Sequence, residues 1–293
     1  MTTIRTSEGT PAASALVDAA QLALVARDAV LCVADLVLDG FRTGVTVETK
    51  RDPRDVVTAV DRRSEERIRE MIVERTPGAT IVGEESGTSV GSRAGLRWYV
   101  DPIDGTNNYV TGFPYFSVSV AAELNGELVA GAVLDPVNDE LFLAGPDGLT
   151  LNGARVEPTE RNSGHGVLLT SQPFQGYAVR ADHLSDLVEL CGELGVVRNP
   201  GSYALQLAHV AVGRASAALE LYAAAPWDVA AGFALVRSGG GSVRLLADPW
   251  EGYGNWGSHS FLAVHSGEVE EELVRRIEEL LRHGTVPTWE AAS

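Results

Sequence analysis

The sequence predicts an α+β protein in which helices cover both faces of its strands. Two segments with helical periodicity come first, and a run of short strands with Asn-Gly turns continues to about residue 155. From residue 167 onward strands and helices alternate, which is typical of sheets covered by helices on both faces. We therefore expect one compact unit with two parts. Residues 1–155 would carry the helices and an antiparallel sheet, and residues 156–293 would form an α/β part that closes a cleft.

The first two elements are expected to be helices. Apolar residues recur at helical spacing near the start: Leu22, Ala26, Ala29, Val33 and Leu36. They predict one long amphipathic helix that ends near Gly40. A β-rich run and a polar loop occupy residues 45–58, and a second helix is expected to begin at Asp61 and to stop before Pro77.

The middle of the chain is expected to be a largely antiparallel sheet. Strand-like runs occupy residues 80–83, 97–101, 116–124, 128–134 and 140–144. Asn125-Gly126 and Asn152-Gly153 are hairpin turn signals, because both residues accept positive φ angles.

In the last part of the chain, segments with strand-like alternation are followed by segments with helical spacing. Strands are expected at residues 167–171, 196–197, 217–221, 242–246 and 261–265. Helices are expected at residues 184–194, 203–212, 229–236 and 269–281.

The amino-acid composition limits which kinds of binding partner the protein is expected to have. The 293 residues include 23 Lys and Arg against 40 Asp and Glu, a net charge of −17. Such a surface argues against nucleic acid or an anionic membrane as the main partner, although a phosphorylated molecule could bind beside a metal ion. No signal peptide or membrane span is expected, and Cys32 and Cys191 are expected to be buried free thiols. These features favour a cytoplasmic protein.

Acidic residues lie at three places where a strand ends or a helix begins. They are Glu84-Glu85 after a strand, Asp101 and Asp104 around Pro102, and Asp228 after Trp227. For any one of these clusters taken alone, a helix N-cap or a turn acid is the favoured explanation. The central cluster is more informative, because Pro102 forces a turn that can bring two carboxylates to one side.

Hard oxygen ligands gather around that turn. The carbonyl of Ile103 lies between Asp101 and Asp104, and two carboxylates with a carbonyl suit Mg²⁺ better than zinc. Gly105 permits a close backbone approach, and Thr106 is expected to begin a short helix with free N–H groups. The sequence therefore predicts metal ligands and phosphate donors within six residues.

These segments resemble the motifs of the inositol monophosphatase family, which are Mg²⁺-dependent, lithium-sensitive phosphomonoesterases. The resemblance rests on Gly83-Glu84-Glu85-Ser86, on residues 101–109 and on residues 227–232, with similarity also at residues 50–61 and at Gly201-Ser202. It spans roughly residues 15–265. It implies a layered α-β-α-β-α sandwich of the sugar-phosphatase type (inositol monophosphatase and fructose bisphosphatase), usually as a homodimer.

The resemblance also implies a set of roles. Two or three Mg²⁺ ions per site would be held by Glu84, Asp101, the Ile103 carbonyl, Asp104 and Asp228. The implied catalytic residues are Glu84, Thr106, Asp61 and Lys50, with the last two in an outer position. The implied substrate contacts are Asp104, Gly105, Thr106, Gly201, Ser202, Tyr203, Glu220 and Asp228. The chemistry would be a two-metal in-line attack of water.

The choice of substrate leaves several possibilities. Glu220 resembles a family residue that contacts substrate hydroxyls, but it lies one residue further from Asp228 than in the animal enzymes, and a surface acid at a strand end is the alternative. The context of Asn107 to Tyr109 resembles the branch that acts on myo-inositol monophosphate. Histidinol phosphate, a 3′-phosphoadenosine nucleotide and fructose bisphosphate are alternatives on the same scaffold. A non-catalytic interaction protein is the alternative from another class.

Overall fold

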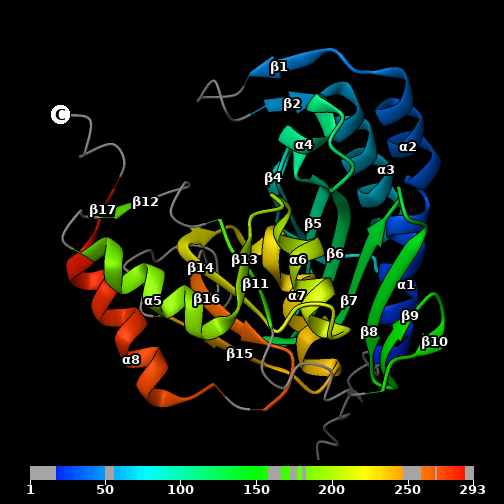
Figure 1. The fold of residues 1–293 in the computed structure, drawn as a ribbon. Helices are drawn as coiled ribbons and strands as arrows, with labels where there is room; N and C mark the ends of the chain where they lie inside the picture. Colours follow the sequence, from blue (N-terminus) through cyan, green and yellow to red (C-terminus); the bar gives the residue numbers. More distant parts are fainter. Residues whose placement is uncertain are drawn as a thin grey trace, which may run out of the picture.

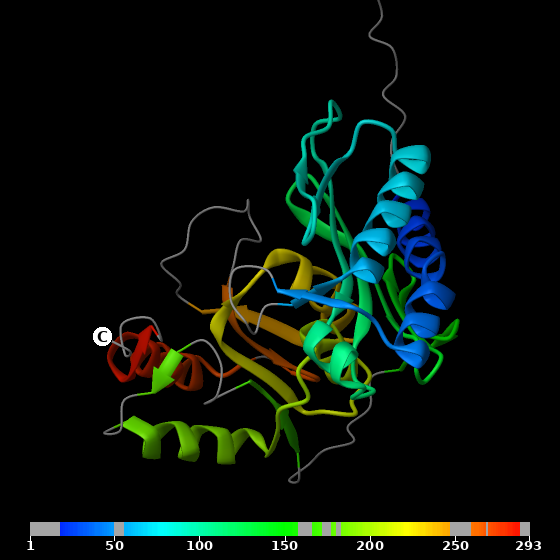
Figure 2. The ribbon, with the colours of Figure 1, turned by 90° about the horizontal axis from the view of Figure 1, so that it is seen from above.

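The computed structural model describes residues 18–49, 56–157, 166–171, 177–179, 183–246, 259–267 and 269–287, and it has five layers (Figure 1). Helices, an eight-stranded sheet, two central helices, a five-stranded sheet and two outer helices follow one another across the molecule, and Figure 2 shows the same order from above. The expected layered α-β-α-β-α sandwich is confirmed.

The first layer contains α1 (Ala19–Leu31), α2 (Ala34–Thr43) and α3 (Ala59–Arg75). The expectation of one long first helix was wrong, because the chain leaves helical geometry at Val33, with φ −114°. Val33 and Val37 remain in the same buried cluster as α1, so the apolar stripe continues across the break.

Gly40 also has a different role from the one expected. It lies inside α2, and a Cβ there would collide with the hydroxyl of Tyr109 and with Val60. The glycine therefore permits close packing, and the helix ends instead at Gly44, which has φ +80°. The next helix, α3, begins two residues before Asp61, because the Thr58 side chain caps it.

The second layer is the eight-stranded sheet, in the order β10-β9-β8-β7-β6-β5-β3-β4 among the described residues. Its strands are β3 (Thr80–Gly83), β4 (Gly87–Ser89), β5 (Leu96–Asp104), β6 (Ser117–Leu124), β7 (Glu127–Asp135), β8 (Glu140–Gly145), β9 (Gly148–Leu151) and β10 (Ala154–Arg155). Among the strands that the structure describes in this sheet, β3 and β5 are the one parallel pair. Asn125 and Gly126 have φ angles of 54° and 88°, which confirms the expected hairpin turn.

The third layer consists of α6 (Tyr203–Ala211) and α7 (Pro226–Ser238), whose residues are largely buried. Both helices share one apolar cluster with strands of both sheets, including Tyr99 of β5 and Phe261 of the second sheet. These two central helices therefore join the two halves of the chain.

The last two layers are the five-stranded sheet and its outer helices. The sheet has the order β13-β11-β14-β16-β15, with parallel pairs at β13-β11-β14 and antiparallel pairs beyond them. The strands are β11 (Val167–Leu169), β13 (Val196–Arg198), β14 (Ala217–Ala224), β15 (Ser242–Leu245) and β16 (His259–Val264). Helices α5 (Leu184–Leu194) and α8 (Glu271–Glu279) cover its outer face.

Short elements complete the described chain. They are β1 (Val47–Thr49) with β2 (Val56–Thr58), β12 (Tyr177–Val179) with β17 (Thr285–Pro287), α4 (Thr106–Thr111) and the π-helical turn η3 (Leu280–Gly284). The last expected helix is therefore shorter than predicted, because its end changes to π-helical geometry. In the described residues, no helix has the length and hydropathy that a membrane span needs.

Candidate active site

Two buried carboxylates lie at the irregular end of β5. Asp101 is 2% exposed and Asp104 is 4% exposed. The pairing of β5 with β6 shifts register between them, at the position where Pro102 has no N–H to donate. The Ile103 N–H turns inward and donates to Asp101 Oδ1 at 3.0 Å. The expectation that the strand ends at Asp101 and turns at Pro102 was wrong, because β5 continues to Asp104 and has only an irregularity in its pairing at this point.

Four acids influence one another at this strand end. Burial raises the pKa of Asp101 well above its usual range, and the charges of Glu84, Asp104 and Asp228 raise it further. Asp101 also shares a side-chain hydrogen bond with Glu84. The structure thus brings together four acids that are spread over more than 140 positions of the sequence.

Glu84 and Asp228 belong to different layers, the eight-stranded sheet and the central helices. Glu84 follows β3, and its N–H donates to the Val100 carbonyl of β5 at 3.2 Å. Asp228 lies in the first turn of α7, behind Pro226, and its Oδ2 accepts the Ala225 N–H at 2.9 Å. Asp228 therefore also has the helix-capping role that its sequence position suggested.

Asp104 links the two halves of the chain. Its Oδ2 accepts the Ala204 N–H at 2.8 Å, the Ser117 hydroxyl at 3.2 Å and the Ser202 hydroxyl. Its Oδ1 accepts a single hydrogen bond from the described residues, from the Tyr203 N–H at 3.0 Å. Asp104 therefore caps the N-terminus of α6, a role that the sequence analysis missed. A carboxylate oxygen can accept two or more bonds, so Oδ1 retains capacity for another ligand.

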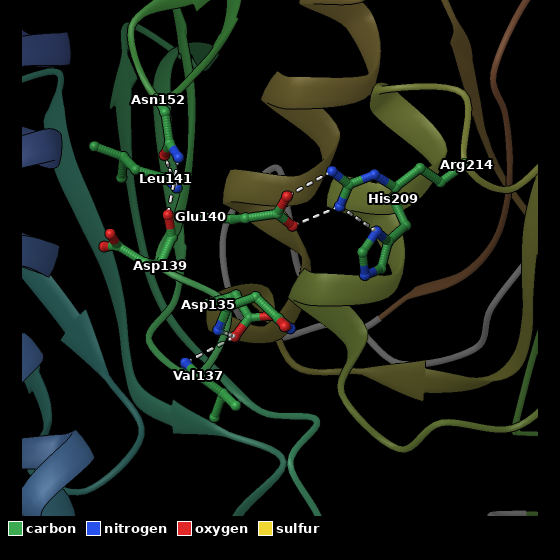
Figure 3. Close-up of polar contacts among 9 residues, drawn as sticks. Asp135, Val137, Asp139, Glu140, Leu141, Asn152, His209 and Arg214 are labelled. Atoms are coloured by element: carbon green, nitrogen blue, oxygen red, sulfur yellow. Dashed lines mark hydrogen bonds and ion pairs between the residues drawn. The ribbon is translucent and has the colours of Figure 1, made fainter.

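The far end of α6 is also attached to the first sheet (Figure 3). Arg214, three residues after the helix, donates to both carboxylate oxygens of Glu140 on β8, at 2.5 and 2.6 Å. The same guanidinium lies 3.5 Å from Nδ1 of His209, which stacks on Tyr115. Helix α6 is thus held at both ends against the sheet that carries Asp101.

Thr106 contacts the acid that begins α3. Its hydroxyl lies 2.9 Å from the Ile103 carbonyl and 3.4 Å from Oδ1 of Asp61. Asp61 is fully buried, and its Oδ2 accepts the Thr58 N–H at 2.9 Å. Burial raises the pKa of Asp61 to about 6, although the hydrogen bonds from Thr58 oppose the rise. The arrangement can hold the Thr106 hydroxyl in one orientation.

Two glycines allow the loops around the site to approach each other. Gly105 has φ +94°, and a Cβ there would lie 3.1 Å from the Gly201 carbonyl and 3.2 Å from Ser202 Cβ. Gly201 has φ +88°. Asn108, which the sequence analysis did not single out, donates to the carbonyls of Tyr115 at 2.6 Å and Pro200 at 2.7 Å. Its amide therefore ties the loop before α6 to α4.

Glu220 is fully buried on β14, so the reading of this residue as a surface acid was wrong. Its Oε1 accepts the Ser171 N–H at 2.8 Å, and its Oε2 accepts the Ser171 hydroxyl. Burial raises the pKa of Glu220 to about 8, which leaves the group largely protonated at neutral pH. The pairing of β14 with β16 shifts register between Glu220 and Ala224, in the segment whose spacing looked unusual.

The donors around Asp101 fit a hard cation. The group offers carboxylate and carbonyl oxygens, which suit Mg²⁺, and a dication would offset the mutual repulsion that raises the Asp101 pKa. Over the described part of the chain, no three Asp, Glu, His or Cys side chains already converge as a ligand set. Asp104 and Asp228 face backbone donors instead. Lys50 lies outside the described residues.

A separate cavity of about 550 Å³ lies between α5 and the end of α8. Its lining is His183, Asp186, Glu189, Arg276, Glu279, Leu280, Arg282 and His283. It shares no residue with the acid cluster, so it does not compete as the site for the predicted chemistry.

Known proteins resemble this chain over most of its length. The family model described as "Inositol monophosphatase family" matches residues 18–282. The "Nus factor SuhB" of Pasteurella multocida is 36% identical over 235 residues, which are 80% of this chain and 84% of that protein. The "Inositol-1-monophosphatase" of Rhizobium meliloti is 38% identical over 193 residues, 65% of this chain and 72% of that protein.

Solved structures show the same similarity. The suhB extragenic suppressor protein of Bartonella henselae superimposes with a TM-score of 0.73 at 30% identity, and the match covers 90% of this chain and 99% of that one. The IMPase of Thermotoga maritima superimposes with a TM-score of 0.70 at 28% identity, over 87% of this chain and 96% of that one.

Proposed function

The chain belongs to the inositol monophosphatase family, and on this premise we propose that it hydrolyses a small phosphomonoester with the help of Mg²⁺. The observation that carries the proposal is the buried Asp101 carboxylate, which shares a hydrogen bond with Glu84 and whose pKa the charges of Glu84, Asp104 and Asp228 raise. We propose myo-inositol monophosphate as the substrate. The Rhizobium meliloti relative, named as an inositol-1-monophosphatase, supports this choice.

The proposed metal ligands divide into two groups that share one residue. Glu84, Asp101 and the Ile103 carbonyl would hold a first ion, and Asp101, Asp104 and Asp228 would hold a second. Mg²⁺ would supply the positive charge that activates water and stabilises the leaving oxygen. The deep burial of Asp101 supports its place between the two groups, because a buried carboxylate needs a cation to remain ionised.

Other residues would bind and orient the reactants. The N–H groups of Gly105 and Thr106 would bind the phosphate at the start of α4. The Thr106 hydroxyl, with Glu84, would orient the attacking water, and Asp61 would hold that hydroxyl in place from an outer position. The 3.4 Å approach of Thr106 to Asp61 supports this role. Lys50 is proposed as an outer residue of the same group.

The leaving group would face Gly201, Ser202, Tyr203 and Glu220. A buried Glu220 with a pKa of about 8 is largely neutral at pH 7, so it can donate a hydrogen bond to a hydroxyl. A neutral carboxyl offers little to the ammonium group of histidinol phosphate. This difference supports a polyol over a cationic leaving group.

The test is phosphate release with Mg²⁺, with and without Li⁺, and after EDTA treatment. The panel contains inositol monophosphates, histidinol phosphate, 3′-phosphoadenosine phosphate and fructose bisphosphate. We expect release from inositol monophosphate that EDTA abolishes, added Mg²⁺ restores and Li⁺ inhibits. Release that EDTA does not affect would contradict the proposed mechanism, and preference for another ester would change only the substrate.

The name of the SuhB relatives favours one second candidate, a role as a Nus factor. A protein with only that role would need no catalytic metal. The candidate would be supported if the purified chain released no phosphate from any ester in the panel.

The expected homodimer remains a proposal. The edge strand β13 exposes Val196 and Val197, and Val188 of the adjacent α5 is 65% exposed. Apolar residues on a strand that ends the sheet, as far as the described residues show, support association with a second copy. Light scattering of the purified protein would give its mass, and 31.1 kDa would exclude the dimer.

A further inference from the structure

Glu65 is a buried carboxylate that the proposed reaction does not use. It lies on α3, one helical turn after Asp61, and none of its side chain is exposed. A buried carboxylate is costly unless its oxygens accept hydrogen bonds. The partners of Glu65 therefore indicate what the residue does.

Two of its three partners belong to the turn that carries Glu84. Glu65 Oε2 accepts the backbone N–H of Glu85 at 2.7 Å, and Oε1 accepts the backbone N–H of Ser86 at 3.0 Å. These residues are 20 and 21 positions away in the sequence. The carboxylate thus binds the two peptide groups that directly follow Glu84.

Gly83, the residue before Glu84, has no side chain and so leaves room for the Glu65 carboxylate. A Cβ on Gly83 would lie 2.7 Å from both Cδ and Oε1 of Glu65, and 2.8 Å from Nη2 of Arg69. Real Cβ atoms do not approach that closely, so only glycine leaves room for the contact. The sequence Gly83-Glu84 therefore combines the proposed ligand with the space that its support requires.

Arg69 completes the connection. Its Nε donates to Glu65 Oε1 at 2.8 Å, its Nη1 donates to the Ser89 hydroxyl at 2.9 Å, and its Nη2 donates to the Gly87 carbonyl. One ion pair on α3 therefore holds the turn between β3 and β4 together with strand β4 itself. The same helix carries Asp61, which contacts Thr106.

We propose that Glu65 is a positioning residue that fixes the Glu84–Ser86 turn and thereby directs the Glu84 carboxylate toward Asp101. The proposal rests on the proposed Mg²⁺ site. Without Glu65, Glu84 keeps its carboxylate but loses its fixed backbone. Mg²⁺ binding should therefore weaken even though no ligand is removed.

The test compares Glu65→Gln with Glu66→Gln, the same change at the next, exposed position of α3. Glutamine has a single acceptor oxygen, so one N–H of the turn loses its acceptor and faces an amide donor. Calorimetric titration with Mg²⁺ should show binding weaker by about tenfold or more in Glu65→Gln, as expected for a lost bond to a charged group. The amides of Glu85 and Ser86 should exchange hydrogen at least about tenfold faster. Glu66→Gln should match the wild type.

A second variant covers the case in which Glu65→Gln does not fold. Gly83→Ala keeps every charge but displaces the Glu65 carboxylate, so it should weaken Mg²⁺ binding in the same direction. Wild-type Mg²⁺ affinity in the folded Glu65→Gln protein, or in Gly83→Ala, would overturn the proposal. Failure of the wild type to release phosphate while it still binds Mg²⁺ would overturn the proposed function alone, because binding and exchange test Glu65 separately.

Discussion

The carboxylate of Asp104 accepts the backbone N–H of Tyr203 at 3.0 Å, although the two residues are 99 positions apart. This bond, with the one from Ala204, places a negative charge at the N-terminus of α6, where the helix dipole favours it. A proposed metal ligand is therefore also the residue that docks the second half of the chain on the first sheet.

Asp104→Asn should loosen the first turn of α6. Asparagine keeps one acceptor oxygen, so either Tyr203 or Ala204 loses its acceptor. Hydrogen exchange of these amides should become about tenfold faster or more, as expected for a lost bond to a charged acceptor. Asp139→Asn is the matched control, because Asp139 is exposed on a turn. Unchanged exchange at α6 in Asp104→Asn would show that the carboxylate does not hold the helix.

Asp101→Asn should separate activity from stability. The change replaces a buried carboxyl whose ionisation burial and three neighbouring acids disfavour, and asparagine can still accept the Ile103 N–H. In metal-free buffer the free energy of unfolding should therefore stay the same or rise. Phosphate release should fall by about 100-fold or more. Full release at saturating Mg²⁺ would remove Asp101 from the proposed mechanism, and denaturant unfolding checks the stability.

Glu220 should make stability decrease as the pH rises. Its pKa is about 8 in the folded protein and 4.5 for the ordinary group, so the unfolded chain ionises first. The free energy of unfolding should fall between about pH 4.5 and 8, with a slope of at most about 1.4 kcal/mol per pH unit from this group. Glu220→Gln should flatten the slope across that window. The exposed Glu127→Gln should keep it, and denaturant unfolding at several pH values measures both.

Substitutions at Gly105 and Gly112 can separate the cost of a strained backbone from the cost of a steric contact with a neighbouring loop. Gly105 and Gly112 flank α4 with φ angles of 94° and 79°. A Cβ on Gly112 would meet nothing within 4 Å, whereas one on Gly105 would press on Gly201 and Ser202. Gly112→Ala should cost about 1 to 2 kcal/mol of unfolding free energy from the left-handed conformation alone. Gly105→Ala should cost more and should also reduce phosphate release. Equal losses in the two variants would mean that the contact with Gly201 is unimportant.

Much of the fold could be predicted because its signals are local. The strand at residues 80–83 and the helix at residues 184–194 match the structure, since periodicity and turn residues act within a few positions. The break at Val33 and the role of Gly40 could not be predicted. Both depend on side chains packed from elsewhere, such as Tyr109 against Gly40.

The residues of the candidate site were likewise partly predictable from local sequence. Residue types and spacing were enough to single out Asp101, Asp104, Glu84 and Asp228 as acids at strand ends and helix starts. A carboxylate beside apolar residues at such a position loses hydration free energy unless it binds a cation or a hydrogen-bond donor. Their second partners were not visible in the sequence. The cap of α6 by Asp104 and the burial of Glu220 against Ser171 join segments 49 to 100 positions apart. No local propensity reaches that far. The packing of α6 against the first sheet decides the Asp104 contact, and the pairing of β11 with β14 decides the contact of Glu220 with Ser171.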